Sequence, residues 1–162
     1  MTNEEMRDKA VELMMVKRFH CSQAVLAVGQ QKLNRKDDEV IRAMGAFGGG
    51  LGGNGEVCGA VAGAVAVIGL RFSRASEDER EDPKMWSYAQ EVLERFRREI
   101  AKDCGSILCR EIAGVDWKDR EQVRAFYKGE RVHECGRIVG DMAMLVFELL
   151  ERADKQELRI VK

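Results

Sequence analysis

The sequence has very little proline and almost no alternation of polar and apolar residues. Pro83 is the only proline among the 162 residues. Proline interrupts helices, and strict alternation of polar and apolar residues is typical of a half-buried strand. The sequence therefore has few helix breaks and few candidate strands. These two absences favour an all-α fold over one built on a β-sheet.

The chain also lacks a long apolar run and an excess of charge of either sign. Its longest uncharged apolar stretch, Val57 to Leu70, has 14 residues, whereas a membrane-spanning helix needs about 20. Residues 1–8 contain no apolar core of a secretory signal. With 27 basic and 28 acidic residues, the net charge of −1 gives no attraction to nucleic acid or anionic lipid. We therefore expect a cytoplasmic protein that binds no nucleic acid and does not insert into a membrane.

Several catalytic and metal-binding motifs are absent as well. The five cysteines form no C-x-x-C pair and no C-x-x-C-H sequence, which excludes thioredoxin, zinc-finger and covalent-haem motifs. No arrangement of serine, histidine and carboxylate indicates a hydrolase, and no general acid or base stands out for turnover of a small substrate. Persistent disulfides are rare in the cytoplasm, so these cysteines are metal ligands, redox thiols or buried small side chains.

What the sequence does contain is helical periodicity along most of its length. Met6, Ala10 and Met14, for example, recur on one face of an amphipathic helix. The expected helices cover residues 3–18, 21–33, 37–46, 57–72, 83–102, a short stretch after 106, 119–127 and 133–153, with a polar tail from about 154. This length suits one domain. We expect a single-domain helical bundle over residues 1–162, with a glycine-rich loop before a buried apolar helix.

Four cysteines lie at or near the expected helix starts: Cys21, Cys58, Cys109 and Cys135. The positive end of a helix favours the thiolate, which is the form of cysteine that binds metals or carries out redox chemistry. Each cysteine shares a helix face with apolar residues, so all four are expected to point inward. Ser106 is expected to cap the short helix and to place Cys109 three residues inside it. Buried free cysteines also pack as small hydrophobic side chains, so simple packing is the alternative to a shared site.

A glycine-rich segment, Gly48–Gly55, precedes one of these cysteines. Part of it spells G-x-G-x-x-G, but the dinucleotide-binding fingerprint needs a preceding strand, and a helix is expected here. We therefore interpret the segment as a loop whose backbone approaches closely, with Cys58 and the adjacent amide of Gly59 facing a bound group. The spacing of Gly59 and Gly63 also lets another helix pack tightly against the apolar helix.

Three further residues could contribute to a site formed by these thiols. His20 and His133 each lie close in sequence to one of the four cysteines, and imidazole is a common metal ligand. The alternative is that both are half-exposed residues at helix starts. Cys104 lies across an expected helix break at Gly105 from Cys109, and we interpret it as a buried bystander, with a resolving thiol or a spare ligand as the alternatives.

Together, these motifs resemble the C_GCAxxG_C_C family of small prokaryotic proteins, which are regarded as redox-active. The matching segments are His20–Leu26, Cys58–Gly63, Gly105–Ile112 and Cys135. The resemblance spans about residues 5–150 and assigns the family's four signature cysteines to the four named above. The fifth cysteine and both histidines lie outside the signature.

The resemblance implies a redox or electron-transfer protein whose four signature cysteines form one site. With four thiolates available, it implies an iron–sulfur cluster, most simply of the 2Fe–2S type, held by Cys21, Cys58, Cys109 and Cys135. One alternative is a thiol–disulfide centre in which Cys104 exchanges with Cys109. Another is a non-redox metal-binding or structural module, with zinc or no metal.

The partners expected from the sequence are a redox protein of unknown identity and, because some family members lie near transporter genes, a transporter. The apolar helices around residues 57–70 and 138–150 could bury more surface than one small bundle provides. On that basis a homodimer is a further expectation.

Overall fold

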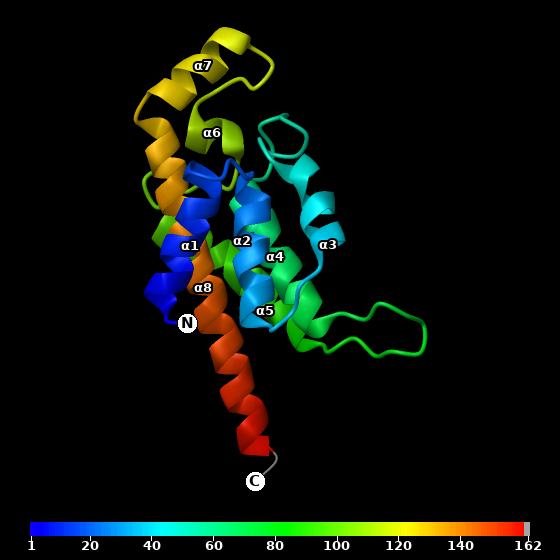
Figure 1. Ribbon diagram of the computed structural model, residues 1–162. Helices are drawn as coiled ribbons and strands as arrows, with labels where there is room; N and C mark the ends of the chain where they lie inside the picture. Colours follow the sequence, from blue (N-terminus) through cyan, green and yellow to red (C-terminus); the bar gives the residue numbers. More distant parts are fainter. Residues whose placement is uncertain (161–162) are drawn as a thin grey trace.

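The computed structural model describes residues 1–160, which form helices and loops with no strand in that range (Figure 1). In chain order the elements are α1 (Asn3–Met15), α2 (Cys21–Lys32), α3 (Asp38–Ala43), the 3₁₀ helix η1 (Met44–Phe47), α4 (Gly59–Phe72), α5 (Lys84–Arg95), the π-helix η2 (Phe96–Ile100), α6 (Cys109–Ala113), α7 (Arg120–Lys128) and α8 (Arg131–Ile160). The helices pack as one body, so the expected all-α fold is confirmed. Val161 and Lys162, the end of the expected polar tail, lie outside the described residues.

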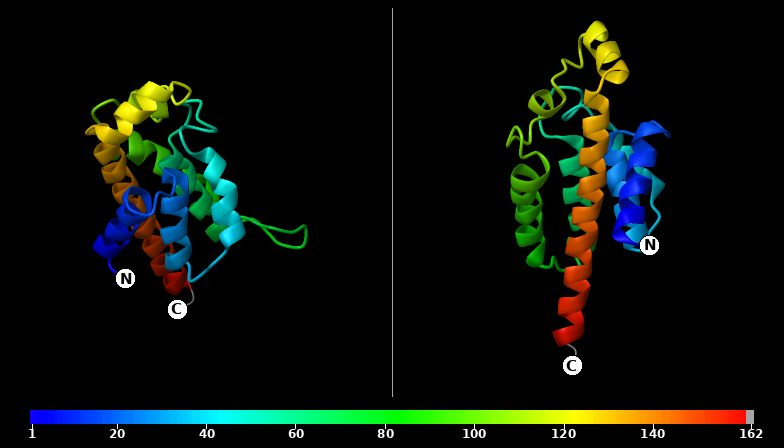
Figure 2. Two further views of the ribbon diagram at one scale, coloured as in Figure 1. Left: turned by 45° about the horizontal axis from the view of Figure 1, so that its top comes forward. Right: turned by 90° about the vertical axis from the view of Figure 1, so that its left-hand side faces the viewer.

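The long helix α8 is the element around which the others pack. It runs the length of the molecule, with α5 on one side and α1 and α2 on the other (Figure 2). Large side chains from several helices are fully buried against one another, among them Leu26, Ile68, Phe96, Met142 and Leu149. Each such side chain stabilises the fold by about 1.5–3 kcal/mol relative to an exposed position.

Helices α2 and α4 approach each other closely because glycine faces backbone at their contact. A Cβ atom added to Gly63 would lie 2.5 Å from the carbonyl oxygen of Ser22, and one added to Gly59 would lie 3.3 Å from the Cβ of Cys21. This is the tight packing that the spacing of the two glycines predicts. It holds the start of α2 beside the start of α4, so Cys21 and Cys58 come close together.

The start of α6 differs from the sequence-based expectation. Ser106 does not cap the helix; its hydroxyl accepts a hydrogen bond from the Leu108 amide at 3.0 Å, and α6 begins only at Cys109. The reason is a long-range backbone pairing between the segments before α4 and α6. The Cys58 amide donates to the Ile107 carbonyl at 2.7 Å, and the Cys109 amide donates to the Glu56 carbonyl at 2.7 Å. The chain therefore stays extended up to Cys109.

The ends of three other expected helices also differ in the structure. The last helix continues to Ile160 rather than ending at Ala153, and Arg71 of α4 pairs there with Asp154 and, at 2.7 Å, with Glu157. The helix expected over residues 83–102 is α-helical only to Arg95 and then widens into the π-helix η2, and the 3₁₀ turn η1 ends the helix expected over 37–46.

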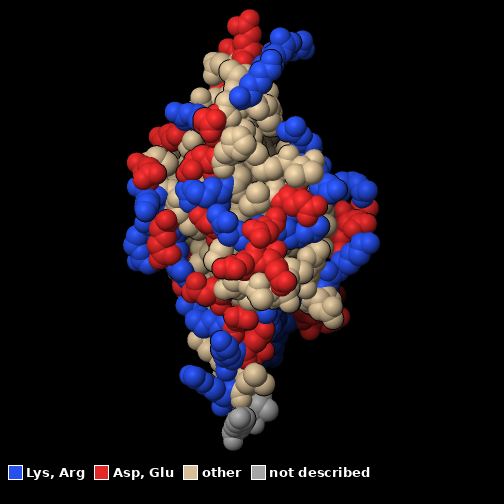
Figure 3. Space-filling model, turned by 60° about the vertical axis from the view of Figure 1, so that its left-hand side comes forward, with Lys and Arg blue, Asp and Glu red and all other residues tan. Residues whose placement is uncertain are grey.

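The surface carries interspersed charges of both signs, with an uncharged area in the upper part of one face, below the end formed by α7 (Figure 3). Arg95 of α5 binds Glu148 of α8 at 2.7 Å, and Arg7 of α1 binds Asp141 of α8 at 3.1 Å. Such partly exposed pairs each contribute at most about 1 kcal/mol. Within residues 1–160, no helix combines the length and the hydropathy required to cross a bilayer.

Candidate functional site

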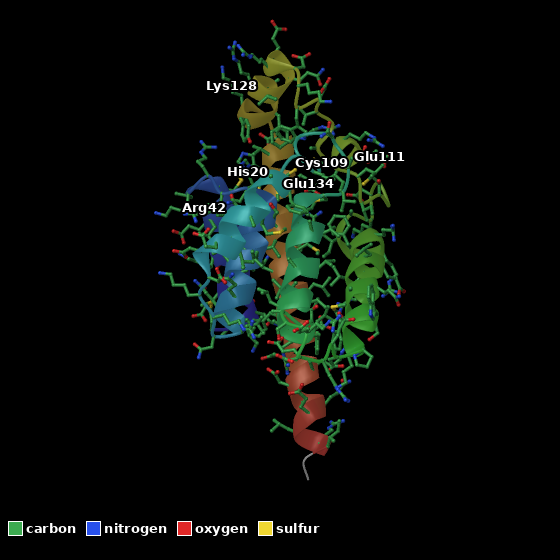
Figure 4. All side chains as sticks on the ribbon, turned by 90° about the vertical axis from the view of Figure 1, so that its right-hand side faces the viewer. His20, Arg42, Cys109, Glu111, Lys128 and Glu134 are labelled. Carbon is green, nitrogen blue, oxygen red and sulfur yellow. The ribbon has the colours of Figure 1, made fainter. Side chains whose placement is uncertain are left out.

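Four cysteines from four separate parts of the chain line one cavity of about 590 Å³. Cys21 is the first residue of α2, Cys58 directly precedes α4, Cys109 begins α6, and Cys135 lies near the start of α8. The cavity lies at the end of the bundle that α6 and α7 cover, where Figure 4 shows His20 and Cys109. The structure thus confirms that all four side chains point inward at helix starts. Their role in binding a cofactor stays a prediction.

The glycine-rich loop forms one wall of this cavity through an unusual backbone conformation. All five residues from Gly49 to Gly53 have positive φ angles, between 61° and 71°, so this segment makes a left-handed turn. Left-handed backbone costs an ordinary residue about 1–2 kcal/mol but costs glycine nothing of this kind. At Gly50 an added Cβ would lie 2.7 Å from the Cβ of Cys109. The loop therefore approaches the start of α6 closely and forms part of the cavity wall, and its approach to a bound group stays a prediction.

Trp117, to which no sequence motif pointed, is in direct contact with one of the thiols. Its indole Nε1–H donates a hydrogen bond to the Sγ atom of Cys109 at 3.3 Å. The ring also packs edge-on against Phe126, with ring centroids 5.0 Å apart, and its Cδ1 atom lies 3.4 Å from a Cβ added to Gly49. The contact forms because the loop between α6 and α7 folds back over the cavity. In the sequence, the only sign of it is that Trp117 lies eight residues after Cys109.

Burial raises the pKa of all four thiols, which is the opposite of the expected preference for thiolate. The pKa of Cys58 rises to about 11 and that of Cys135 to about 12, in each case chiefly because burial disfavours the charged form. The pKa of Cys21 lies well above its usual range through burial and the neighbouring thiols, and that of Cys109 is also raised.

Local hydrogen-bond donors oppose this effect without overcoming it. The backbone amides of Ala60 and Val61, at the start of α4, lower the pKa of Cys58, and the indole of Trp117 lowers that of Cys109. The helix-start argument therefore has the correct sign at Cys58, but desolvation outweighs it. The four cysteines are neutral thiols near pH 7, and a bound metal would have to displace their protons.

We expect the free energy of unfolding to fall as the pH rises from about 9 to about 11. In this window the Cys58 thiol has lost its proton in the unfolded chain but keeps it in the folded protein, so rising pH favours unfolding. Cys58→Ala removes this proton, and its stability should fall less steeply than that of wild type, by about 1.4 kcal/mol per pH unit. Urea unfolding of both proteins at several pH values measures the difference between their free energies of unfolding. The titrations of lysine and tyrosine are common to both proteins and cancel in this difference. Parallel pH profiles would contradict the prediction.

The thiols surround a volume rather than a point. In the part of the chain that the structure describes, no three histidine, cysteine or acidic side chains lie close enough together to hold one metal ion. A tetrahedral zinc site brings three or four ligands to within about 2.0–2.3 Å of a single ion. The four cysteines are thus arranged around a cavity that a larger group would have to fill.

The remaining candidate residues are placed differently from one another. Gly59 lines the cavity, as does His20, whose exposed side chain lies at its edge, whereas His133 is exposed outside the cavity lining. The expectation that Cys104 is buried was wrong: it is exposed, does not line the cavity, and its thiol donates a hydrogen bond to the Ala101 carbonyl at 3.6 Å. All five cysteines are free, so Cys104 and Cys109 do not form a disulfide in this structure.

The fold and the site define a class of helical protein in which four helix starts each bring a thiol to one cavity. A family model described as "Putative redox-active protein (C_GCAxxG_C_C)" matches residues 19–149. The chain therefore belongs to this family, as its motifs suggested. Comparisons with curated proteins and with solved structures gave no match.

Proposed function

We propose that this protein is an electron carrier whose redox centre is an iron–sulfur cluster held by Cys21, Cys58, Cys109 and Cys135. The observation that carries the proposal is that these four thiols, from four different elements, line a single cavity. Membership of a family described as redox-active supports the same class of function. When bound, such a cluster gains and releases electrons at a potential that its surroundings set.

The chemistry of the donor set suits a cluster better than a single ion. A cluster distributes four cysteine ligands over two or more irons, so its ligands surround a volume and need not meet at one point. The cavity of about 590 Å³ offers such a volume, and most of its lining is apolar. Apolar walls keep water away from a metal centre and thereby influence its potential.

The surrounding donors have a defined part in this proposal. The amides of Ala60 and Val61 at Cys58, and the indole of Trp117 at Cys109, offer hydrogen bonds to ligand sulfurs. These donors stabilise negative charge on sulfur, so they orient the ligand and raise the reduction potential of a bound centre. Because the thiols are protonated near pH 7, loading releases protons and should be favoured by rising pH.

Anaerobic reconstitution with ferrous iron and sulfide tests the proposal. Wild-type protein should develop visible absorption and retain iron and sulfide after desalting. Cys58→Ser should retain at least tenfold less iron, since loss of a ligand costs no less than the 10–100-fold typical of an outer-shell partner. Cys104→Ser is the matched control, because it removes an exposed thiol outside the cavity and should load like wild type.

Two results would contradict the cluster. One is wild-type protein that remains colourless and iron-free after anaerobic reconstitution while retaining its helical circular dichroism. The other is equal iron loss in Cys58→Ser and Cys104→Ser. Thiol titration of the metal-free protein before and after mild oxidation then tests the thiol–disulfide alternative, which requires the number of free thiols to fall reversibly.

A further inference from the structure

The cavity has a polar mouth and an apolar interior. Arg18, His20 and Tyr127 line it and have exposed side chains, so they lie at its opening. Ile138 and Val139 of α8 line it too, but they are buried and form part of its floor. A cavity of about 590 Å³ with apolar walls and a few polar groups at one end has the size and composition of a small-molecule binding site.

The electrostatics of the mouth favour a negative charge. Arg18 is the only arginine or lysine among the described residues that line the cavity, and no aspartate or glutamate lines it. Within residues 1–160 Arg18, like several other exposed arginines, forms no ion pair, so what sets it apart is its place in the cavity lining. A guanidinium group without a partner, at the opening of an apolar cavity, is a strong recognition element for carboxylate, sulfonate or phosphate groups.

The neighbouring groups add donors to the same opening. Burial raises the pKa of the Tyr127 hydroxyl, and the nearby charge of Arg18 opposes this effect, so the phenol remains a hydrogen-bond donor close to the guanidinium. Arg18 itself has a φ angle of 63°, a left-handed conformation that would suit glycine better. The α1–α2 connection thus holds an arginine in a strained conformation, with its side chain at the cavity opening.

We propose that the cavity binds a small organic anion, whose acidic group pairs with Arg18 at the mouth and whose apolar body enters the space beside the four thiols. The observations behind this ligand site, the charge at the mouth and the apolar walls, do not depend on the proposed cluster, although both groups would use the same cavity. It would place an amphipathic acid next to the cysteine site.

Two dyes of matched shape test the proposal on the reduced, metal-free protein. Anilinonaphthalenesulfonate has an apolar ring system with one sulfonate, and N-phenylnaphthylamine has the same rings without the charge. The variant Arg18→Gly removes the guanidinium at a left-handed position, so it should fold at least as stably as wild type. We expect it to bind the sulfonate dye about tenfold more weakly and the neutral dye with affinity within twofold of wild type.

A control and a location test complete the experiment. Arg42→Gln removes an exposed guanidinium on α3 that pairs with Glu39 outside the cavity lining, and it should leave both affinities unchanged (Figure 4). The chain has two tryptophans, so Trp86→Phe makes Trp117 in the cavity the single energy-transfer donor to bound dye.

The proposal is overturned if wild type binds no sulfonate dye, if Arg18→Gly affects both dyes equally, or if it affects neither. It is also overturned if Trp117 transfers no energy to the bound dye. Because the protein in these assays carries no iron, none of these results depends on whether the iron–sulfur cluster forms.

Discussion

Gly50→Ala is expected to lower the free energy of unfolding by about 3–5 kcal/mol, and to disrupt the cysteine site with it. Gly50 has a φ angle of 71°, where any other residue pays about 1–2 kcal/mol. Its added Cβ would also lie 2.5 Å from the Glu56 amide nitrogen and 2.7 Å from the Cβ of Cys109. Backbone cannot rotate away as a flexible side chain can, so the loop and the start of α6 must separate.

Gly52→Ala isolates the steric part of this effect. Gly52 belongs to the same left-handed turn, with a φ angle of 64°, but its added Cβ would meet only the Nδ2 atom of Asn54, at 3.5 Å. This variant should therefore lose only about 1–2 kcal/mol. Urea unfolding compares the two, and iron retention after reconstitution reports on the site. Equal losses in both variants would show that the close approach of Gly50 to Glu56 and Cys109 does not matter.

Gly63→Ala should lower the free energy of unfolding by about 2–4 kcal/mol, because it forces α2 and α4 apart. The added Cβ would lie 2.5 Å from the carbonyl oxygen of Ser22 and 3.2 Å from its carbonyl carbon, which are both backbone atoms of α2. Ser22 follows Cys21 directly, so the displacement moves Cys21 relative to Cys58. We therefore expect reduced iron retention together with reduced stability.

Gly69→Ala, in the same helix, is the matched control and should have the opposite sign. An added Cβ at Gly69 meets no atom within 4 Å, so alanine there gains helix propensity without a steric cost. It should raise the free energy of unfolding by up to about 1 kcal/mol and leave iron retention unchanged. If Gly63→Ala were also neutral, the close packing of α2 on α4 would not position Cys21.

Much of the secondary structure could be predicted because its determinants are local. Asp119 accepts hydrogen bonds from the amides of Glu121 and Gln122, as a helix-capping aspartate should. Helical spacing of apolar residues likewise depends only on neighbours three and four positions apart. The prediction failed where distant residues intervene, as at the end of α8, which Arg71 of α4 stabilises by pairing with Glu157.

The sequence by itself determined that the chain is helical, that four cysteines lie at helix starts, and that the loop before Cys58 is built for close backbone approach. These features follow from residue type and short-range spacing. Only the tertiary structure decided that the four thiols share one cavity, that Trp117 donates to Cys109, and that Arg18 lies at the cavity mouth. It also reversed the expected thiolate state, since desolvation depends on the packing of the whole fold and here exceeds the influence of the local helix starts.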